Sequence, residues 1–334
     1  MTAMRTLIVG IGALGGTIAT RALAAGIPVS LATRTAASAS LLRSSGLRVS
    51  GIDGAAAVTS FHVEALEEYR EKFDLVLLAT KAREALEISP LVAALLAPGG
   101  TLLSIQNGGV SQLLFERLGG SVLLGGISNL GATMLEPGTY EQRNAGHLLV
   151  GEVEGGESGR AAAVARALSP AVETRVTTNL RGAVWAKLLL NCSVTTIGAI
   201  AGRTLREYMT LAEGREVFRR AYDEALGVAL ASGARPERMI VEPVPPGWIG
   251  PGYETWIGRI ISAYGDLKPS MLQDFERGRR TEVDFISGYV SQLGAQIGVP
   301  VPMNAAIAAT VHLIEEKRLR PAAALLAELL HRAG

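Results

Sequence analysis

The chain has 334 residues, of which 48% are hydrophobic and 19% charged, so it is long enough for two domains and too apolar for a disordered protein. Its 32 basic and 31 acidic residues nearly cancel, which argues against a surface for nucleic acid or for an anionic membrane. The single cysteine, Cys192, excludes an intrachain disulfide and a cysteine-built metal site, and it favours a reducing cytoplasm.

The sequence also predicts no export signal, membrane span or metal site. No basic segment precedes a long apolar run near the N-terminus, and no uncharged apolar run reaches about 18 residues. The four histidines are scattered and lack the spacing of metal ligands. We therefore expect small-molecule partners.

The first predicted element is a buried strand over residues 7–9 that runs directly into a glycine-rich turn and a helix over residues 17–24. Gly10, Gly12 and Gly15 fit the G-x-G-x-x-G spacing of a dinucleotide-binding loop. The first N–H groups of the helix have no partner within it and can bind a pyrophosphate, and we expect Ala13 and Leu14 of the turn to contact the cofactor as well. The alternative is an ordinary glycine-rich strand-to-helix turn.

Three later strand ends carry polar residues where α/β sheets place their ligands. A strand over residues 28–33 ends at Arg34, where an arginine in place of an acid favours NADPH over NADH. The apolar strand over residues 73–79 ends at Lys81, and the strand over residues 101–105 ends at Asn107. A solvated side chain is the alternative for both Arg34 and Lys81.

The strand and helix alternation stops near residue 178, so we expect a nucleotide-binding domain over residues 1–178 and a helical domain over residues 179–334. Within the first domain, the sequence predicts a connecting helix over residues 63–69. It also predicts three short strands that complete the sheet, over residues 121–126, around Tyr140 and over residues 147–151.

A proline- and glycine-rich interruption of the helical domain spans residues 236–258 and carries three aromatic residues. The packing of a long loop is one interpretation of these aromatic side chains, and a mobile flap is the other. The aromatic residues are Trp248, Tyr253 and Trp256.

Lys187, Asn191 and Thr195 follow one another at intervals of four in an apolar helix, so they lie on one stripe and can converge on one ligand. The chain has 27 arginines and only five lysines, which draws attention to each lysine. A lysine can lose its proton when desolvated and an arginine cannot, so Lys187 suits proton transfer. The alternative is a lysine whose stem lies along an apolar helix.

A second polar group occupies residues 268–288. Ser270 and Gln273 have the spacing of a capping box, and Glu282 begins an apolar run with helical period. Taken alone, each of these residues is also explained by helix stabilisation.

Five segments together resemble the ketopantoate reductase family, the 2-dehydropantoate 2-reductases, in the order that the family has them. The resemblance covers nearly the whole chain, and the last segment is far more specific than the glycines. The segments are GIGALGG, LLATKA, SIQNGG, WAKLLLNC and SMLQDFERGRRTEVDFISG.

This resemblance implies an α/β fold: an N-terminal Rossmann-type, doubly wound sheet followed by an all-helical domain of the 6-phosphogluconate dehydrogenase type. It implies reduction of ketopantoate to pantoate by NADPH, with a small 2-ketoacid as substrate. A homodimer is left open.

The resemblance also implies roles for individual residues. Lys187 would donate the proton, and Glu282 would hold the substrate hydroxyl and order the cofactor. Asn191 and Ser270 would bind the carboxylate and hydroxyl of the substrate, while Asn107 and Lys81 would lie near the nicotinamide and its ribose.

One position departs from the family. Thr195 stands where the family has a second asparagine, so it keeps one donor and one acceptor but loses reach. A reductase for another small carbonyl or imine substrate is therefore the alternative function. A non-catalytic NADPH-binding protein is disfavoured, because Lys187 and Glu282 are both present.

Overall fold

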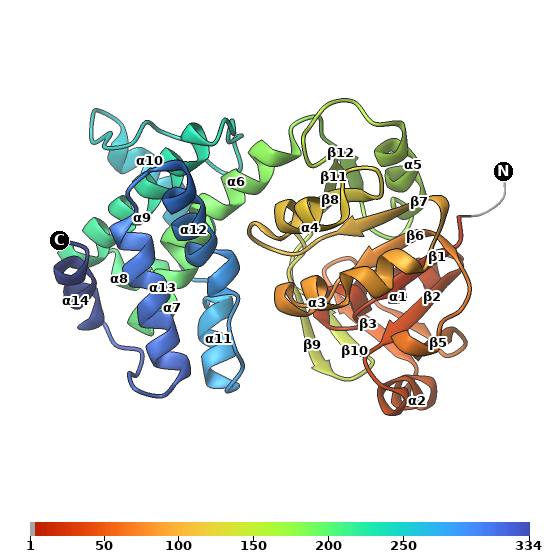
Figure 1. Cartoon of the computed structure of the whole chain (residues 1–334). Coiled ribbons are helices and arrows are strands. Elements are labelled where there is room, and N and C mark those ends of the chain that lie inside the picture. Colours follow the sequence, from red (N-terminus) through yellow and green to blue (C-terminus); the bar gives the residue numbers. More distant parts are fainter. Residues whose placement is uncertain (1–3) are drawn as a thin grey trace. The chain divides into compact units, whose positions relative to one another are not determined.

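The computed structural model describes residues 4–334 and divides the chain into two compact units (Figure 1). The first comprises the chain up to Gln106 together with Val110–Leu180, and the second comprises Asn107–Gly109 and Arg181–Gly334. The first unit is built of strands and helices, and the second is helical, which confirms the predicted α/β class with a helical C-terminal part.

The first unit is organised by an eight-stranded sheet in the order β12-β11-β8-β7-β6-β1-β2-β5. Neighbouring strands are parallel except for β8 and β11. The chain adds β2 and β5 on one side of β1, and β6, β7 and β8 on the other side. The strand order therefore reverses between β1 and β6, as in doubly wound nucleotide-binding sheets. The strands are β1 Thr6–Val9, β2 Val29–Thr33, β5 His62–Ala65, β6 Phe73–Leu78, β7 Leu96–Ser104, β8 Leu123–Ser128, β11 Leu148–Gly151 and β12 Thr174–Val176.

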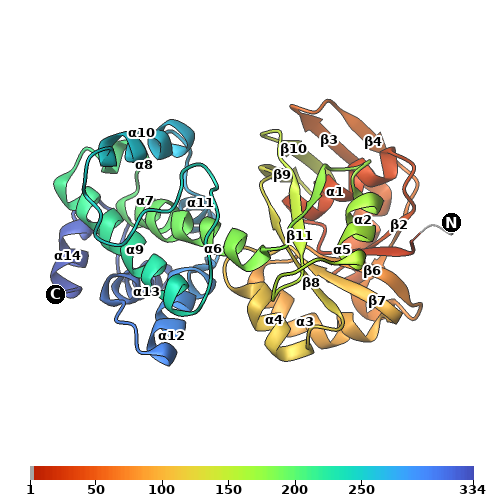
Figure 2. The same ribbon diagram turned by 90° about the horizontal axis from the view of Figure 1, so that it is seen from above.

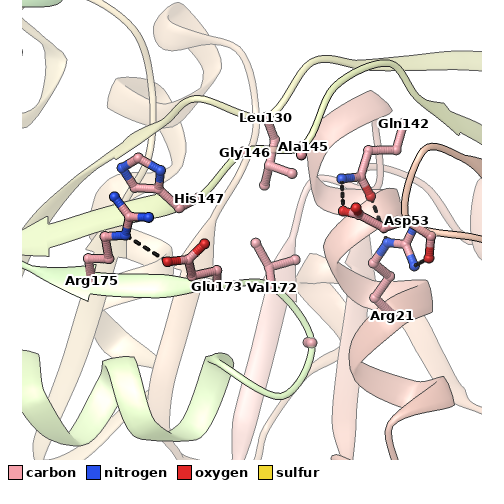
Figure 3. Close-up of a pocket in the computed structure, with 11 residues that line it drawn as sticks. Arg21, Asp53, Leu130, Gln142, Ala145, Gly146, His147, Val172, Glu173 and Arg175 are labelled. Carbon is pink, nitrogen blue, oxygen red and sulfur yellow. Dashed lines mark hydrogen bonds and ion pairs between the residues drawn. The ribbon is translucent and has the colours of Figure 1, made fainter. Parts of the chain in front are cut away.

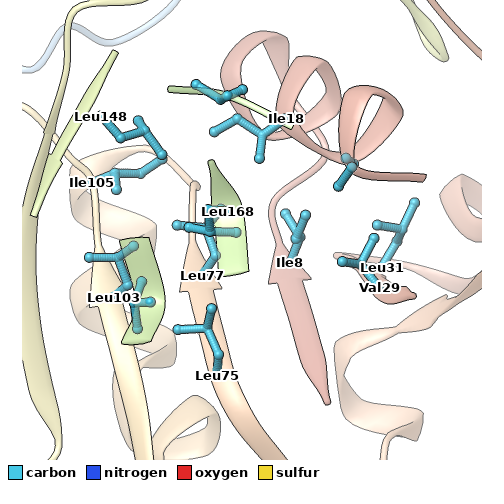
Figure 4. Packing of buried hydrophobic residues seen from close by; sticks show 14 of the residues in the cluster. Ile8, Ile18, Val29, Leu31, Leu75, Leu77, Leu103, Ile105, Leu148 and Leu168 are labelled. Atoms are coloured by element: carbon cyan, nitrogen blue, oxygen red, sulfur yellow. The ribbon is translucent and has the colours of Figure 1, made fainter. Parts of the chain in front are cut away.

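Helices flank this sheet and bury its apolar side chains. Ile8, Leu31, Leu77 and Leu103, from four neighbouring strands, pack beneath Ile18 of α1, and all five are buried (Figure 4). Because helices cover both faces of the sheet, the sequences of these strands are nearly continuous apolar runs. The helices of this unit are α1 Ala13–Ala24, α2 Ala36–Ser45, α3 Ala82–Ala94, α4 Val110–Leu118 and α5 Gly159–Leu168.

The prediction that the Tyr140 strand belongs to the main sheet is wrong. Tyr140 lies in β10 of a separate four-stranded sheet, in the order β4-β3-β10-β9, which packs against α1. The fully buried Tyr140 ring occupies the space above Gly16, where an added Cβ would lie 2.0 Å from the ring. The strands are β3 Leu47–Gly51, β4 Ala56–Val58, β9 Ala132–Glu136 and β10 Thr139–Gln142.

The predicted connecting helix over residues 63–69 is also wrong. Residues 62–65 form β5, which pairs in parallel with β2 at the sheet edge, and only Leu66–Glu68 form a single 3-10 turn, η1. The backbone N–H and C=O groups of these residues form hydrogen bonds with the edge strand β2, and these bonds favour a strand where the local sequence alone predicts a helix. The side-chain pattern of these residues does not reveal that edge.

The second unit contains helices packed around α7, every residue of which is buried (Figure 2). Ile197 and Ile200 of α7 lie in the core with Phe218 of α9 and Ile307 of α13. The helices are α6 Leu180–Leu190, the π-helical η2 Asn191–Thr195, α7 Thr196–Ala201, α8 Leu205–Tyr208, α9 Ala212–Ala231, α10 Tyr253–Tyr264, α11 Ser270–Glu276, the 3-10 turn η3 Val283–Phe285, α12 Ser287–Ile297, α13 Pro302–Glu315 and α14 Leu325–Arg332.

The continuous helical stretch Leu180–Ala201 is long and apolar enough to cross a membrane by length and composition. Buried residues make up 72% of its most apolar window. A largely buried helix of this kind is explained by packing in the protein core.

The aromatic residues near the proline-rich interruption take part in packing. Trp256 is 8% exposed, contacts the rings of Phe218 and Tyr222 on α9, and donates its indole N–H to the Glu242 carbonyl at 2.9 Å. Tyr253 stacks on Trp256. These contacts show that the aromatic side chains are packed, but Tyr253 and Trp256 lie in α10, so the predicted interruption over residues 236–258 is wrong from residue 253 on.

Candidate active site

The glycine turn after β1 has a backbone geometry that requires glycine at two positions. Gly10 has φ +94°, and an added Cβ would lie 2.7 Å from the Thr80 backbone nitrogen. At Gly15 an added Cβ would lie 2.0 Å from the Gly10 carbonyl oxygen, so only glycine permits this approach of helix to strand.

Gly12 differs from the other two glycines because its Cα faces open space. No heavy atom of the described chain lies within 4 Å of an added Cβ there. Gly12 is the N-cap of α1 without a side-chain cap, and the first helical hydrogen bond runs from Gly16 N–H to the Gly12 carbonyl at 2.8 Å. The N–H groups of Ala13 and Leu14 precede that bond, so the turn fits an anionic ligand at the helix N-terminus.

Arg34 directly follows β2, at the sheet edge where the sequence predicts the cofactor ribose. Its side chain is 75% exposed, and its Nε and one terminal nitrogen both donate to a single oxygen of Glu84, at 2.7 and 2.5 Å. Glu84 lies in the first turn of α3. The guanidinium is thus held at the sheet edge by the Glu84 carboxylate.

A buried amide that the sequence analysis did not single out braces the neighbouring strand end. Gln106 donates to the carbonyls of Leu78 and Thr80 at 2.7 and 3.1 Å and accepts from the Ser104 hydroxyl at 2.6 Å. Lys81, the N-cap of α3, follows Thr80 and is exposed. The apolar-to-amide transition at residues 105–106 was the available signal, but only the structure shows that Gln106 bonds back to β6.

The turn with Asn107 belongs to the helical unit. Gly109 N–H donates to the Phe285 carbonyl at 3.1 Å, and Gly108, at φ +74°, leaves space for that carbonyl. The Tyr289 ring covers Gly109 and contacts Trp185, two residues before Lys187. The turn with Asn107, the start of α12 and the helix with Lys187 therefore meet at Tyr289.

Lys187 lies among apolar neighbours, since Trp185 and Leu188 are both buried. Burial lowers the pKa of Lys187 from 10.5 to about 8, and the charge of Glu282 acts in the opposite direction. The residue as a whole keeps partial exposure. The structure thus brings Lys187 and Glu282 into electrostatic contact within one unit, although 95 positions separate them in the sequence.

The stripe of Lys187, Asn191 and Thr195 is not one regular α-helix. Residues 191–195 form a π-helical turn, in which the Thr195 hydroxyl donates to Asn191 Oδ1 at 3.3 Å. Such turns concentrate at functional sites and change the direction in which the side chains point. The prediction of uniform α-helical spacing is therefore wrong at these positions.

Ser270 does not form a capping box, which was the structural alternative to a binding role for this residue. Pro269 is the N-cap of α11, Ser270 is the first helical residue, and Gln273 N–H donates to the Pro269 carbonyl. Pro269 packs against α7 at Gly198, where an added Cβ would lie 2.7 Å from the proline ring. This packing places the start of α11 beside the helix that follows Thr195.

The first unit also contains a cavity of about 490 Å³ that none of the predicted site residues lines (Figure 3). Arg21 donates to the buried Gln142, and Gln142 in turn donates to Asp53. On the other side Arg175 donates to Glu173 at 2.7 Å. Arg21 and Asp53 therefore bond to opposite ends of the neutral Gln142 amide, while Arg175 and Glu173 form an ion pair.

Comparison with known proteins identifies the family. The family described as ketopantoate reductase PanE/ApbA matches residues 6–155, and its C-terminal counterpart matches residues 179–315. A 2-dehydropantoate 2-reductase of Pyrococcus abyssi is 30% identical over 307 residues, which cover 90% of this chain and 94% of that protein.

Solved structures show the same fold. A PanE/ApbA family ketopantoate reductase from Ralstonia eutropha is 26% identical, with a TM-score of 0.79 over 94% of this chain and 99% of that one. A D-mandelate dehydrogenase in complex with NADH and anilino(oxo)acetate is 20% identical, with a TM-score of 0.79 over 94% of this chain and 99% of that one, and shares the fold. The chain therefore belongs to the ketopantoate reductase family, whose members are oxidoreductases acting on CH–OH groups.

Proposed function

We propose that this protein reduces 2-ketoacids with NADPH, and that its principal substrate is ketopantoate, which becomes pantoate. The observation that carries the proposal is the environment of Lys187, a lysine among apolar side chains with its pKa lowered to about 8 and Glu282 as its charged neighbour. A general acid is most effective when its pKa lies near the working pH. An arginine could not serve, because it does not give up its proton.

The glycine turn and the sheet edge support NADPH as the cofactor. The Ala13 and Leu14 N–H groups, beside the open space at Gly12, would hold the pyrophosphate. Arg34 would bind the 2′-phosphate, and Lys81 would lie near the nicotinamide end. When bound, NADPH supplies the hydride that adds to the carbonyl carbon.

Lys187 completes the reduction by protonating the oxygen. As the carbonyl carbon gains a hydride, its oxygen gains negative charge, and the Lys187 ammonium transfers one proton to it to give the alcohol. The neutral amine then regains a proton from water. Such general acid catalysis contributes roughly 10²- to 10⁴-fold to the rate.

The other site residues have binding roles in this proposal. Glu282 holds the substrate hydroxyl and, by its charge, keeps Lys187 protonated up to a higher pH. Asn191 and Ser270 bind the carboxylate and hydroxyl groups, and Asn107 orients the nicotinamide end.

A reductase for another small carbonyl or imine compound is the second candidate. The Thr195 hydroxyl donates to the Asn191 amide oxygen, so this chain fixes Asn191 with a shorter side chain than the family's second asparagine. A shorter side chain at position 195 would then suit a substrate of different size.

A panel of substrates distinguishes the two candidates. The purified protein is mixed with NADPH and, in separate reactions, with ketopantoate, other branched 2-ketoacids, aryl 2-ketoacids and cyclic imines, and the product is identified by mass spectrometry. Ketopantoate should give the highest kcat/KM. A higher kcat/KM with another compound would transfer the assignment to that substrate, and no turnover across the panel would contradict a reductase.

The predicted cell compartment and partners belong to the same proposal. We expect the reaction to take place in the cytoplasm and to require no nucleic acid or membrane. The buried thiol of Cys192, whose pKa is raised to about 12, is kept from reacting there by its burial.

A further inference from the structure

The segment that carries Glu282 is fastened on both sides of that residue. The backbone N–H and the hydroxyl of Thr281 both donate to Glu315 Oε1, each at 2.7 Å. The same hydroxyl accepts from Val283 N–H at 3.3 Å. The two neighbours of Glu282 are thereby linked, through one hydroxyl, to one carboxylate.

The second oxygen of Glu315 begins another connection to the same segment. Glu315 Oε2 lies 3.3 Å from His312 Nδ1, and His312 Nε2 lies 2.9 Å from Asp284 Oδ1. Glu315 is 13% exposed and is the last residue of α13, a helix anchored in the core by Ile307. Glu315 therefore ties residues 281–284 to the core of the unit.

The segment is also held by the buried side chain of Val283 and by the hydrogen bond from Gly109 N–H to the Phe285 carbonyl at 3.1 Å, but its own turn is short. Its 3-10 turn contains three residues, with backbone hydrogen bonds from Phe285 to Glu282 at 2.9 Å and from Ile286 to Val283 at 3.0 Å. An isolated turn of this kind is a weak constraint. A functional carboxylate has to be held to within about 0.5 Å by the residues around it.

We propose that Glu315 is a positioning residue, which holds Glu282 beside Lys187 by accepting two hydrogen bonds from Thr281 and by its contact with His312. The proposal rests on the function proposed above for Glu282. Glu315 acts through the backbone of residues 281–283, and its role is to fix geometry.

Three variants test this assignment. In Glu315→Ala, kcat for reduction of the 2-ketoacid should fall at least about tenfold, because small displacements of catalytic groups lower rates by up to about 10²-fold. The KM for NADPH should stay within about twofold of wild type. Glu315→Gln should recover most of the lost kcat, because its amide oxygen can accept both hydrogen bonds from Thr281. Glu316→Ala, a change at the neighbouring exposed glutamate, is the matched control and should behave as wild type.

The outcomes separate this inference from the function on which it rests. An inactive wild-type protein removes the proposed function, whereas an active wild type with Glu282→Gln impaired and Glu315→Ala unimpaired removes only the positioning role. Equal loss of kcat in Glu315→Gln and Glu315→Ala would also overturn it. If Glu315→Ala does not fold, Thr281→Val is measured in its place, because valine keeps the shape of threonine and removes only the hydroxyl. A wild-type kcat in Thr281→Val would contradict the proposal.

Discussion

At the scale of single residues, Lys187 connects activity to stability. Its pKa is about 8 in the folded protein and 10.5 for an ordinary lysine, so between these values the unfolded chain binds more protons than the folded one. Below pH 8 the charged, desolvated ammonium destabilises the fold, and this penalty disappears as the pH rises toward 10.5. The desolvation that lowers the pKa of Lys187 and suits it to proton transfer thus also lowers the stability of the folded protein.

Lys187→Met should therefore lower kcat at least about 100-fold and raise the melting temperature at pH 7. The advantage in melting temperature should shrink as the pH rises from about 8 to 10.5, because the wild-type lysine becomes neutral in that window. Calorimetry across pH measures the stability, and NADPH oxidation measures the activity. Lys72→Met, at an exposed lysine, is the control, and an Lys187→Met variant with near-wild-type kcat would contradict the role of Lys187.

Arg34 and Glu84 should have opposite effects on cofactor choice. Arg34→Ala removes the group proposed to bind the 2′-phosphate, so NADPH should bind more weakly while NADH binding changes little. Glu84→Gln removes the carboxylate that now holds the guanidinium, so NADPH should bind more tightly. Titration calorimetry with both cofactors measures these affinities, and an equal loss for NADPH and NADH in Arg34→Ala would refute the assignment.

At the scale of elements, the π-helical turn after α6 has identifiable causes. The Ser193 hydroxyl donates back to the Leu189 carbonyl at 2.7 Å, and the Tyr208 hydroxyl donates to the Ser193 carbonyl at 2.6 Å. Side chains that compete for backbone carbonyls distort a regular α-helix. The turn that carries Asn191 is therefore shaped by a tyrosine from another helix.

Tyr208→Phe should destabilise the protein by about 1–3 kcal/mol, because it leaves a buried carbonyl without its donor. The KM for the 2-ketoacid should rise as well, since Asn191 begins the same turn. Urea denaturation measures the first effect and steady-state kinetics the second. Tyr253→Phe, at a partly exposed tyrosine, should change stability by less than about 0.5 kcal/mol, and an equally mild Tyr208→Phe would contradict this explanation.

Sequence alone predicted those elements whose signal is local. The strand before Gly10 and the apolar strand before Lys81 follow from continuous apolar runs and glycine punctuation. The strand around Tyr140 was predicted but placed in the wrong sheet, and the strand at residues 62–65 was missed, because pairing depends on partners distant in the chain. Likewise, the capping box that was an alternative interpretation of Ser270 does not form, because Pro269 is the N-cap of α11.

The candidate site was predictable to the level of residue types. Lys187 and Glu282 stood out because a lysine is unusual in an apolar helix and because both match family motifs. Gln106 and Glu315 could not be found in this way, since each acts by hydrogen bonds to backbone groups far away in the sequence. Such bracing leaves no periodic pattern and no motif.

At the scale of the whole molecule, the pyrophosphate of the cofactor should bind to the first unit, at the glycine turn. Saturating NADPH, at about 100 times its dissociation constant, should stabilise the protein by about 2.7 kcal/mol. Hydrogen exchange should slow most at the amides of Ala13, Leu14 and the residues after Arg34. Protection confined to the cavity lined by Arg21 and Gln142 would show that the cofactor site is elsewhere.

The measurement that tests the central claim most directly is the oxidation of NADPH by ketopantoate with wild-type protein and with Lys187→Met, both shown to be folded and to bind NADPH. The wild type should consume one NADPH for each pantoate formed. Lys187→Met should retain NADPH binding and lose at least about 99% of the turnover, in keeping with the loss of a general acid. Wild-type protein that binds NADPH but reduces neither ketopantoate nor any other 2-ketoacid, or turnover that survives in Lys187→Met, would contradict the account.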